Sequence, residues 1–212
     1  MYLSAPKGFR DRTLVVERLA MLETSEHVQP LRDFSAALVE RRRGRNPTIE
    51  VPDFDPADAG VSARVLLLFE SPGDKTLAGP NGSGFISADN DDETAKNVWE
   101  ARDAEGMHEG VAAWNIVPWF LGIGDKSASA EEVGQGAMEL RLLLPIFADL
   151  EAVVLCGAGA KSGWKRFVSP HVDDSRLTVI ETWNPAPRTF AQAGKQQHFR
   201  NAMHRAAPFA RK

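Results

Sequence analysis

Polar side chains stand at the ends of several apolar runs in this chain. Glu70 and Ser71 directly follow the run 63–69, Asn115 lies within the next run, and Asn184 comes three residues after the last one. A carboxamide offers one acceptor and two donors, a set that can pair with the edge of a planar base or of another amide-like ligand. The alternative for Asn115 is a purely structural amide that bonds to loop backbone, because buried polar groups are generally satisfied.

Prolines stiffen the turns in which these side chains lie. Pro72 follows Glu70 and Ser71, Pro118 follows Asn115, and Pro185 and Pro187 follow Asn184. Proline fixes φ, so such turns hold their neighbours rigidly, as a preorganised site requires. We therefore expect a site built from strand ends rather than from one contiguous motif.

The apolar runs alternate with amphipathic segments along the main body of the chain. Short runs rich in aliphatic residues are typical of strands buried on both faces, and strand–helix alternation predicts a parallel sheet with helices on both sides. Ligands of such sheets bind beyond the carboxyl ends of the strands. The expected strands are 63–69, 111–117, 151–156 and 177–181, and the expected helices are 91–104, 129–150, 159–168 and about 194–206.

The first 60 residues have a different character. Residues 11–43 carry apolar positions spaced by three and four, which predicts two helices, and 44–60 contains three prolines and reads as a connector. The predicted organisation is N-terminal helices and connector over 1–60, packed on a domain over 61–212.

Composition excludes several classes of protein. The chain has 212 residues, 43% hydrophobic and 25% charged, and its single cysteine, Cys156, rules out an internal disulfide framework and any cysteine-based zinc or iron–sulfur site. No apolar run approaches the roughly 20 residues that cross a bilayer, and no signal-peptide stretch opens the sequence. We expect a cytoplasmic protein without membrane partners.

Charge is distributed unevenly. The net charge is −4, yet residues 184–212 contain six lysines and arginines and no Asp or Glu. Such a segment is either a solvated helix face or a surface for an anionic partner.

Two further motifs have weaker interpretations. The segment "CGAGAKSG" fits neither phosphate-binding motif, since Ala160 and Leu155 stand where the phosphate-binding loop needs glycine. The segment "DNDDETAKNVWE" has Thr94 where a calcium loop needs glycine, so helix capping explains its acidic residues better. The histidines are not spaced as metal ligands, and we expect no metal or other cofactor.

The order of these motifs resembles the uracil-DNA glycosylase superfamily. The resemblance spans about 63–205, and its layout is closest to the branch whose first motif reads Gly-Glu-Ala-Pro-Gly, which normally carries an iron–sulfur cluster that this chain cannot hold. It implies a three-layer α/β/α fold with a central four-stranded parallel sheet, preceded here by the N-terminal helices. The matching segments are "LLLFESPGD", "SGFIS", "WNIVPW", "VVLCGAGA" and "NPAPR".

The resemblance also implies roles for individual residues. Glu70 and Ser71 match the water-activating motif, and Asn184 matches the catalytic position of the His-Pro-Ser-Pro motif. Phe85 matches the aromatic residue on which the extruded base stacks, and Asn115 matches the asparagine that reads the base edge. The remaining implied contacts are Pro72 and Gly73 with the substrate and Pro185, Pro187, Arg188 and Lys195 with DNA.

These roles imply a monofunctional DNA glycosylase of base-excision repair. It would extrude uracil or a related deaminated base from DNA and hydrolyse the N-glycosidic bond. The partner would be DNA containing a damaged base, bound by a monomer. Asn184 replaces the usual histidine donor, and Ser71 replaces a stronger base, so we expect weak activity. The alternative is a non-catalytic or weakly active DNA- or nucleobase-binding module on the same fold. For Phe85 alone, the alternative is a loop residue that covers the hydrophobic core.

Overall fold

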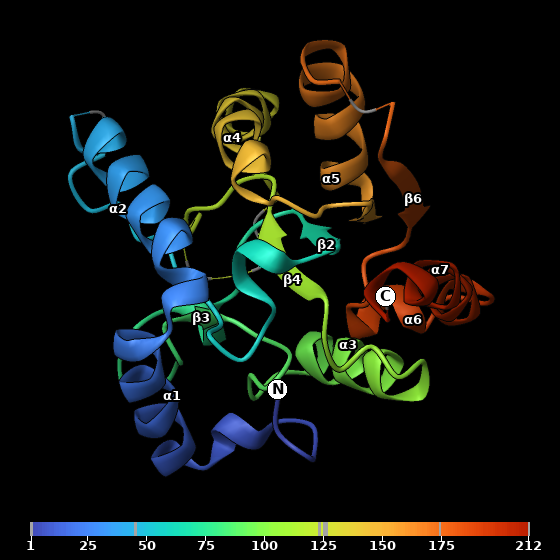
Figure 1. The fold of residues 1–212 in the computed structure, drawn as a ribbon, viewed down its shortest axis with the longest axis horizontal. Coiled ribbons are helices and arrows are strands. Elements are labelled where there is room, and N and C mark those ends of the chain that lie inside the picture. Colours follow the sequence, from blue (N-terminus) through green and yellow to red (C-terminus); the bar gives the residue numbers. More distant parts are fainter. Residues whose placement is uncertain (1, 45, 123, 125–126, 174, 212) are drawn as a thin grey trace.

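The computed structural model describes residues 2–44, 46–122, 124, 127–173 and 175–211, and its centre is a four-stranded sheet (Figure 1). The strand order is β4-β2-β5-β6, and all three pairings are parallel. This confirms the predicted α/β class with a central four-stranded parallel sheet. The strands are β2 (Val65–Phe69), β4 (Val111–Asn115), β5 (Ala152–Cys156) and β6 (Thr178–Thr182).

The strands form where the sequence supplies side chains for two buried faces. Residues 65–68 of β2 are buried on both sides, as are all five residues of β5. By contrast, β6 at one edge of the sheet exposes Thr178 and Glu181, whereas all five residues of β4 at the other edge are buried. The predicted run 111–117 ends as a strand at Asn115, after which the N–H groups of Ile116 and Val117 donate to the carbonyls of Phe69 and Glu70.

Helices cover both faces of the sheet. Figure 1 shows α4 (Ala130–Leu143) and α5 (Ala158–Gly163) on one side of the strands, with α3 (Glu93–Ala104) and α7 (Lys195–Ala210) on the other. This is the predicted three-layer arrangement. Within the described part of the chain, no helix has the length and apolar character needed to span a membrane.

Local signals place the helix boundaries. The Asp92 carboxylate accepts a hydrogen bond from the Ala95 N–H at the start of α3, and Ser129 and Glu132 form a capping box at the start of α4. The segment predicted as a helix over 159–168 is α-helical only to Gly163 and continues as a π-helix over Trp164–Val168. In the last helix, α7 extends four residues beyond the predicted end at 206.

The N-terminal helices contribute to the main core. Predicted as two helices, this region forms α1 (Arg12–Thr24) and α2 (Gln29–Arg43), and α2 inserts Leu31, Phe34 and Leu38 into the core of the sheet. The predicted boundary near residue 60 stays a prediction.

A second, smaller hydrophobic cluster lies beneath α1. Two short strands that the sequence did not suggest, β1 (Asp53–Phe54) and β3 (Phe85–Ile86), pair in parallel beside it. This cluster consists of Phe9, Val15, Leu22, Val28 and Phe85.

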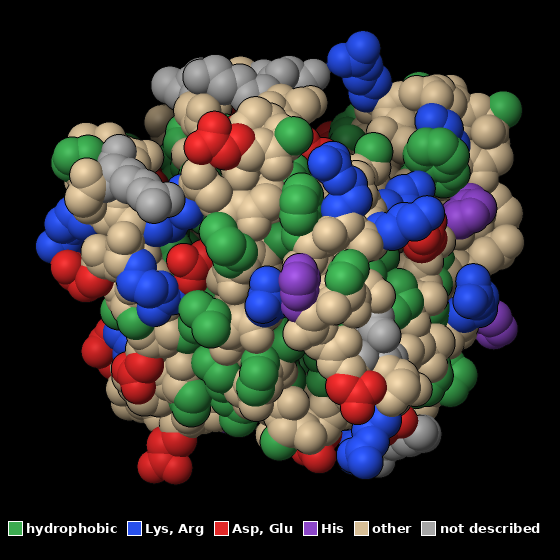
Figure 2. Space-filling model, turned by 90° about the horizontal axis from the view of Figure 1, so that it is seen from above, with side chains coloured by type: hydrophobic (Ala, Val, Ile, Leu, Met, Phe, Trp, Pro, Cys, Tyr) green, Lys and Arg blue, Asp and Glu red, His purple; other side chains and the backbone are tan. Residues whose placement is uncertain are grey.

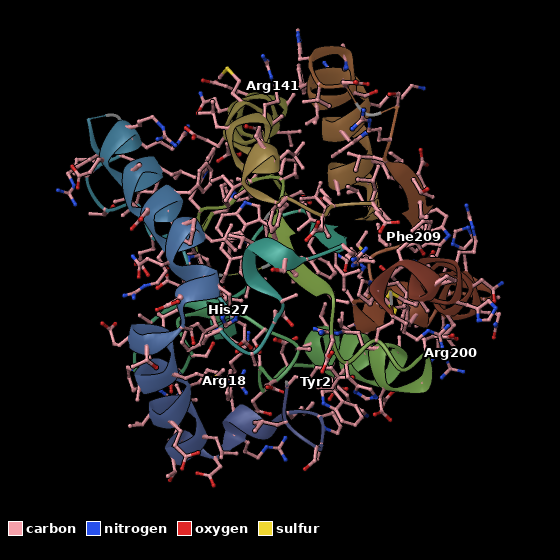
Figure 3. All side chains as sticks on the ribbon, in the orientation of Figure 1. Tyr2, Arg18, His27, Arg141, Arg200 and Phe209 are labelled. Atoms are coloured by element: carbon pink, nitrogen blue, oxygen red, sulfur yellow. The ribbon has the colours of Figure 1, made fainter. Side chains whose placement is uncertain are left out.

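Buried ion pairs fasten the N-terminal region to the loop before α3. The Arg18 guanidinium of α1 donates to Asp55 at 2.5 Å and to Asp89 at 2.9 Å. The Asp89 carboxylate also accepts from the Leu3 N–H at 3.1 Å. In Figure 3, Arg18 lies on the side of α1 that faces α3, with Tyr2 nearby. Burial, together with the nearby Asp55 charge, raises the pKa of Asp89 to about 6 despite the Arg18 contact.

This raised pKa makes a pH-dependent contribution to stability. Because the folded state holds the Asp89 proton more tightly than the unfolded chain does, the stability contributed by this group is greatest at low pH. It falls as pH rises from about 4 to about 6. We predict that Asp89→Asn removes this slope, so that wild type loses about 2–3 kcal/mol relative to the variant between pH 4 and pH 7. Urea unfolding at each pH gives the free energy of unfolding of both proteins. If the wild-type value minus the variant value stays constant or increases from pH 4 to pH 7, the prediction is wrong.

Candidate functional site at the carboxyl rim of the sheet

The predicted site residues follow the strands at one rim of the sheet. Glu70 comes directly after β2, Asn115 is the last residue of β4, and Asn184 follows β6. The turn after β5, which begins at Gly157, lies between the segments that follow β2 and β6 because β5 separates these two strands. Parallel pairing therefore brings residues from distant parts of the sequence to one edge.

Glu70 has a fixed position at this rim. One carboxylate oxygen accepts from the Ala128 N–H at 3.0 Å, and the Glu70 backbone carbonyl accepts from Val117 N–H at 2.9 Å. Its side chain also lies against the first turn of α5. A Cβ added at Gly159 would lie 2.5 Å from Glu70 Cγ and 2.6 Å from Cδ. The carboxylate is thus held between the loop before α4 and the start of α5.

Asn115 is buried without a partner for its side chain. Only 3% of the residue is exposed, and it lies opposite Phe69 in the β2–β4 register. Among the residues that the structure describes, none forms a hydrogen bond with its carboxamide, and its polar atoms are not among the fully buried ones that lack a partner. The small exposed part of Asn115 therefore includes amide groups that a ligand with complementary donors and acceptors could reach.

Asn184 uses only part of its hydrogen-bonding capacity. Its side-chain oxygen accepts from the Ala186 N–H at 3.2 Å, which closes a turn in the loop. Within the described chain, the amide nitrogen donates to no other residue. The residue packs against Gly157, where φ is 103° and an added Cβ would approach Asn184 Cβ to 3.1 Å. Asn184 therefore retains free donors at the start of α5.

A residue of α3 that the sequence did not single out holds the same loop. Asn97 donates from its amide nitrogen to the Pro185 carbonyl at 2.6 Å. Pro187 then starts the short helix α6 (Pro187–Phe190), and Arg188 is exposed. A polar residue on a helix surface carries no sequence signal for this role.

The loop after β2 offers both side-chain and backbone groups. Ser71 is half-buried, Pro72 is buried and Gly73 is exposed. The Gly73 carbonyl accepts from the Thr76 N–H and hydroxyl at 3.0 and 2.6 Å. In the described residues, the Ser71 hydroxyl has no hydrogen-bond partner.

Phe85 differs from its predicted position over a base. The ring is 0% exposed and packs in the cluster beneath α1, with the Phe9 ring centroid 6.3 Å away. The physical reason is that the apolar side chains of α1 pack against Phe85, which buries its ring. The structure thus brings Glu70 and Asn184 to opposite sides of the turn after β5, places Asn115 on the strand beside β2, and encloses Phe85 elsewhere.

Positive charge flanks the rim on the side of β6. The Lys195 ammonium lies 3.8 Å from the centroid of the Trp183 ring, and the Lys161 ammonium lies 4.7 Å from it. The sequence pointed to Lys195 but missed Lys161 and the exposed ring.

The described residues contain no group of three His, Cys, Asp or Glu side chains that could hold a metal ion. Cys156 is fully buried at the end of β5, and burial raises the pKa of its thiol well above the ordinary value. A neutral thiol in this position packs as a small apolar group.

Comparison with known proteins gives limited similarity. No protein-family model and no curated protein matches the chain. Among solved structures, mimivirus uracil-DNA glycosylase (UNG) Y322F in complex with UGI is 11% identical, with a TM-score of 0.40, over 88% of this chain and 72% of that one. A structure of mimivirus uracil-DNA glycosylase is 12% identical, also with a TM-score of 0.40, over 84% and 72%. Because the sequence identities and TM-scores are low, the function has to be inferred from the residues at the rim.

The close approach of Glu70 and Gly159 is testable through stability. We predict that Gly159→Ala lowers the free energy of unfolding by about 1–3 kcal/mol, because the new methyl group displaces the Glu70 side chain and its hydrogen bond to Ala128. In a Glu70→Ala background the same substitution should cost much less. Urea unfolding of the four proteins gives the coupling energy.

Gly73→Ala is the matched control, since nothing lies within 4 Å of a Cβ there and the glycine has a φ of −90°. We expect it to change stability by under about 0.5 kcal/mol. Additive effects of the Glu70 and Gly159 substitutions would contradict the observed packing.

Proposed function

We propose that the chain is a monofunctional DNA glycosylase that removes uracil or a related deaminated base. The observation that carries the proposal is the Asn115 carboxamide, which lies at the end of β4 with no hydrogen-bond partner among the described residues while its polar atoms still reach solvent. A rigid strand end that holds an available amide suits the recognition of a planar ring with its own amide edge. Uracil has such an edge.

The reaction breaks the bond between the base nitrogen and the sugar carbon, and the electron pair leaves with the base. Negative charge then develops on a base oxygen, and fixed donors aimed at that oxygen stabilise the transition state. Asn184 has free amide N–H groups for this role. Asn115 would read the base edge, and Pro72 and Gly73 would contact the base through their backbone.

A water molecule supplies the oxygen that replaces the base on the sugar. Glu70 and Ser71 follow the central strand and would orient this water, and the Glu70 carboxylate would favour the positive character of the sugar. The water loses a proton as the new bond forms, and the base gains one after it departs. Pro185, Pro187, Arg188 and Lys195 would contact the DNA around the extruded nucleotide.

We assign no stacking role to Phe85, since its ring has no exposed face. Asn184 favours a second candidate, a DNA- or nucleobase-binding module with little or no catalysis, because a neutral amide cannot exchange protons as histidine does. The two candidates differ in whether an abasic product forms.

Base release from oligonucleotides tests the enzymatic proposal. With uracil, hypoxanthine or xanthine in single- and double-stranded oligonucleotides, we expect release of at least one base at stoichiometric enzyme. Asn184→Ala should slow single-turnover release roughly 100- to 1000-fold, as the loss of a charge-stabilising donor does elsewhere. Asn201→Ala, which alters an exposed amide of α7, should leave the rate unchanged. No release of any base would sink the proposal.

A histidine at position 184 separates the two candidates. Asn184→His places a donor of adjustable proton affinity at the start of α5, and we expect it to raise single-turnover release about 10-fold or more. Its rate should depend on pH near the histidine pKa, whereas the wild-type rate should not show that dependence. Activity that appears only in the histidine variant would identify the natural chain as a binding module.

A further inference from the structure

Two lysine ammonium groups lie over the ring of an exposed tryptophan that directly follows β6. Trp183 is 37% exposed, and its ring centroid lies 3.8 Å from the Lys195 ammonium and 4.7 Å from that of Lys161. Lys161 belongs to α5 and Lys195 starts α7. Because these helices cover opposite faces of the sheet, the ring joins cations from both layers at the rim (Figure 1).

Among the described residues, no carboxylate pairs with either ammonium group. Neither lysine forms an ion pair with any residue in the described ranges. One exposed carboxylate, Glu181, lies two residues before Trp183, and the chain from Asn184 onward has no acidic residue. Viewed from above, Lys and Arg side chains gather over the half of the molecule that holds α5 and β6 (Figure 2).

This arrangement concentrates positive charge that an anion would balance. An exposed cation–π contact is worth about 0.5–1 kcal/mol, which is small enough for a lysine to exchange the ring for a phosphate. Once a lysine moves, the indole ring presents a flat apolar surface. Cations combined with an exposed aromatic ring are the elements with which proteins bind single-stranded nucleic acid.

We propose that Lys161, Trp183 and Lys195 bind single-stranded DNA beside the nucleotide held at the rim. The lysines contact successive phosphates, and an unpaired base stacks on Trp183. A duplex cannot use the ring in this way because its bases are already stacked on one another. The choice of DNA rests on the proposed function, since Trp183 directly precedes Asn184.

The competing explanation is a purely structural contact that links α5 to α7 through the ring. In that case the substitutions would alter thermal stability and leave DNA binding unchanged. Binding and stability are therefore measured on the same variants.

Binding of an undamaged, fluorescein-labelled oligothymidine tests the proposal without any chemistry. We expect salt-dependent binding, and Lys161→Gln and Lys195→Gln should each reduce the slope of log K against log salt by about 0.7. Trp183→Leu should weaken binding roughly 5- to 100-fold, and Trp183→Phe should retain most of the affinity. Arg205→Gln is the matched control, because it removes one exposed charge farther along α7.

The same variants bound to a fully paired duplex should show little dependence on Trp183. Equal effects of Lys161→Gln, Lys195→Gln and Arg205→Gln on oligothymidine binding would overturn the proposal. The proposal would also fail if Trp183→Leu weakened duplex binding as much as it weakened oligothymidine binding. Should Trp183→Leu unfold the chain, Trp183→Phe and the two lysine variants still decide the outcome.

These results are separable from the glycosylase proposal. Variants that lose oligothymidine binding as expected while no base is ever released support this site and sink the catalytic function. If the variants release base at the wild-type rate and bind oligothymidine with wild-type affinity, this binding site is wrong and the glycosylase proposal still stands.

Discussion

The contact between Glu70 and the first turn of α5 sets the geometry of the rim. The Glu70 side chain occupies the space that a Cβ at position 159 would need, and the Asn184 side chain packs against Gly157 in the same turn. Two glycines therefore let the segments after β2 and β6 approach β5 closely from both sides. The carboxylate of Glu70 and the carboxamide of Asn184 thus pack on two sides of one turn, each against a position that has no side chain. This packing fixes the relative positions of the polar groups without any direct bond between them.

The N-terminal region depends on a different kind of interaction. Arg18 and Arg102 are buried and pair with Asp55, Asp89 and Asp58. Buried charges are costly to desolvate, so the loss of one partner from such a pair destabilises the fold more than the intact pair stabilises it. They join α1, the connector and the loop before α3 into one unit. Phe85 belongs to this unit, since the loop that carries it also carries Asp89.

Much of the fold could be predicted because its signals are local. The strands are apolar runs buried on two faces, and Ser129 and Asp92 mark helix starts by their own chemistry. In contrast, β1 and β3 have two residues each, too few for any periodicity to be visible.

The candidate site was predictable in part for the same reason. Asn115 and Asn184 stand out because polar side chains at the ends of apolar strands need an explanation. Asn97 and Lys161 lie on helix surfaces, where a polar residue is the ordinary choice, and only the fold shows what they contact. Phe85 had two interpretations in sequence, and the choice between them depended on α1, which is far from it along the chain.

The chemistry available at the rim follows from its neutral donors. Asn115 and Asn184 carry no charge and cannot exchange protons, so they can act on a substrate only as dipoles held in place. Fixed dipoles are effective when the surroundings do not have to reorganise as charge develops, and a strand end and a proline-bounded loop provide such surroundings. The Asn115 amide has no hydrogen-bond partner among the described residues and stays available to a ligand, because its polar atoms are not fully buried at the end of β4. The rim therefore offers neutral amides from the two edge strands, with the Glu70 carboxylate after β2 between them.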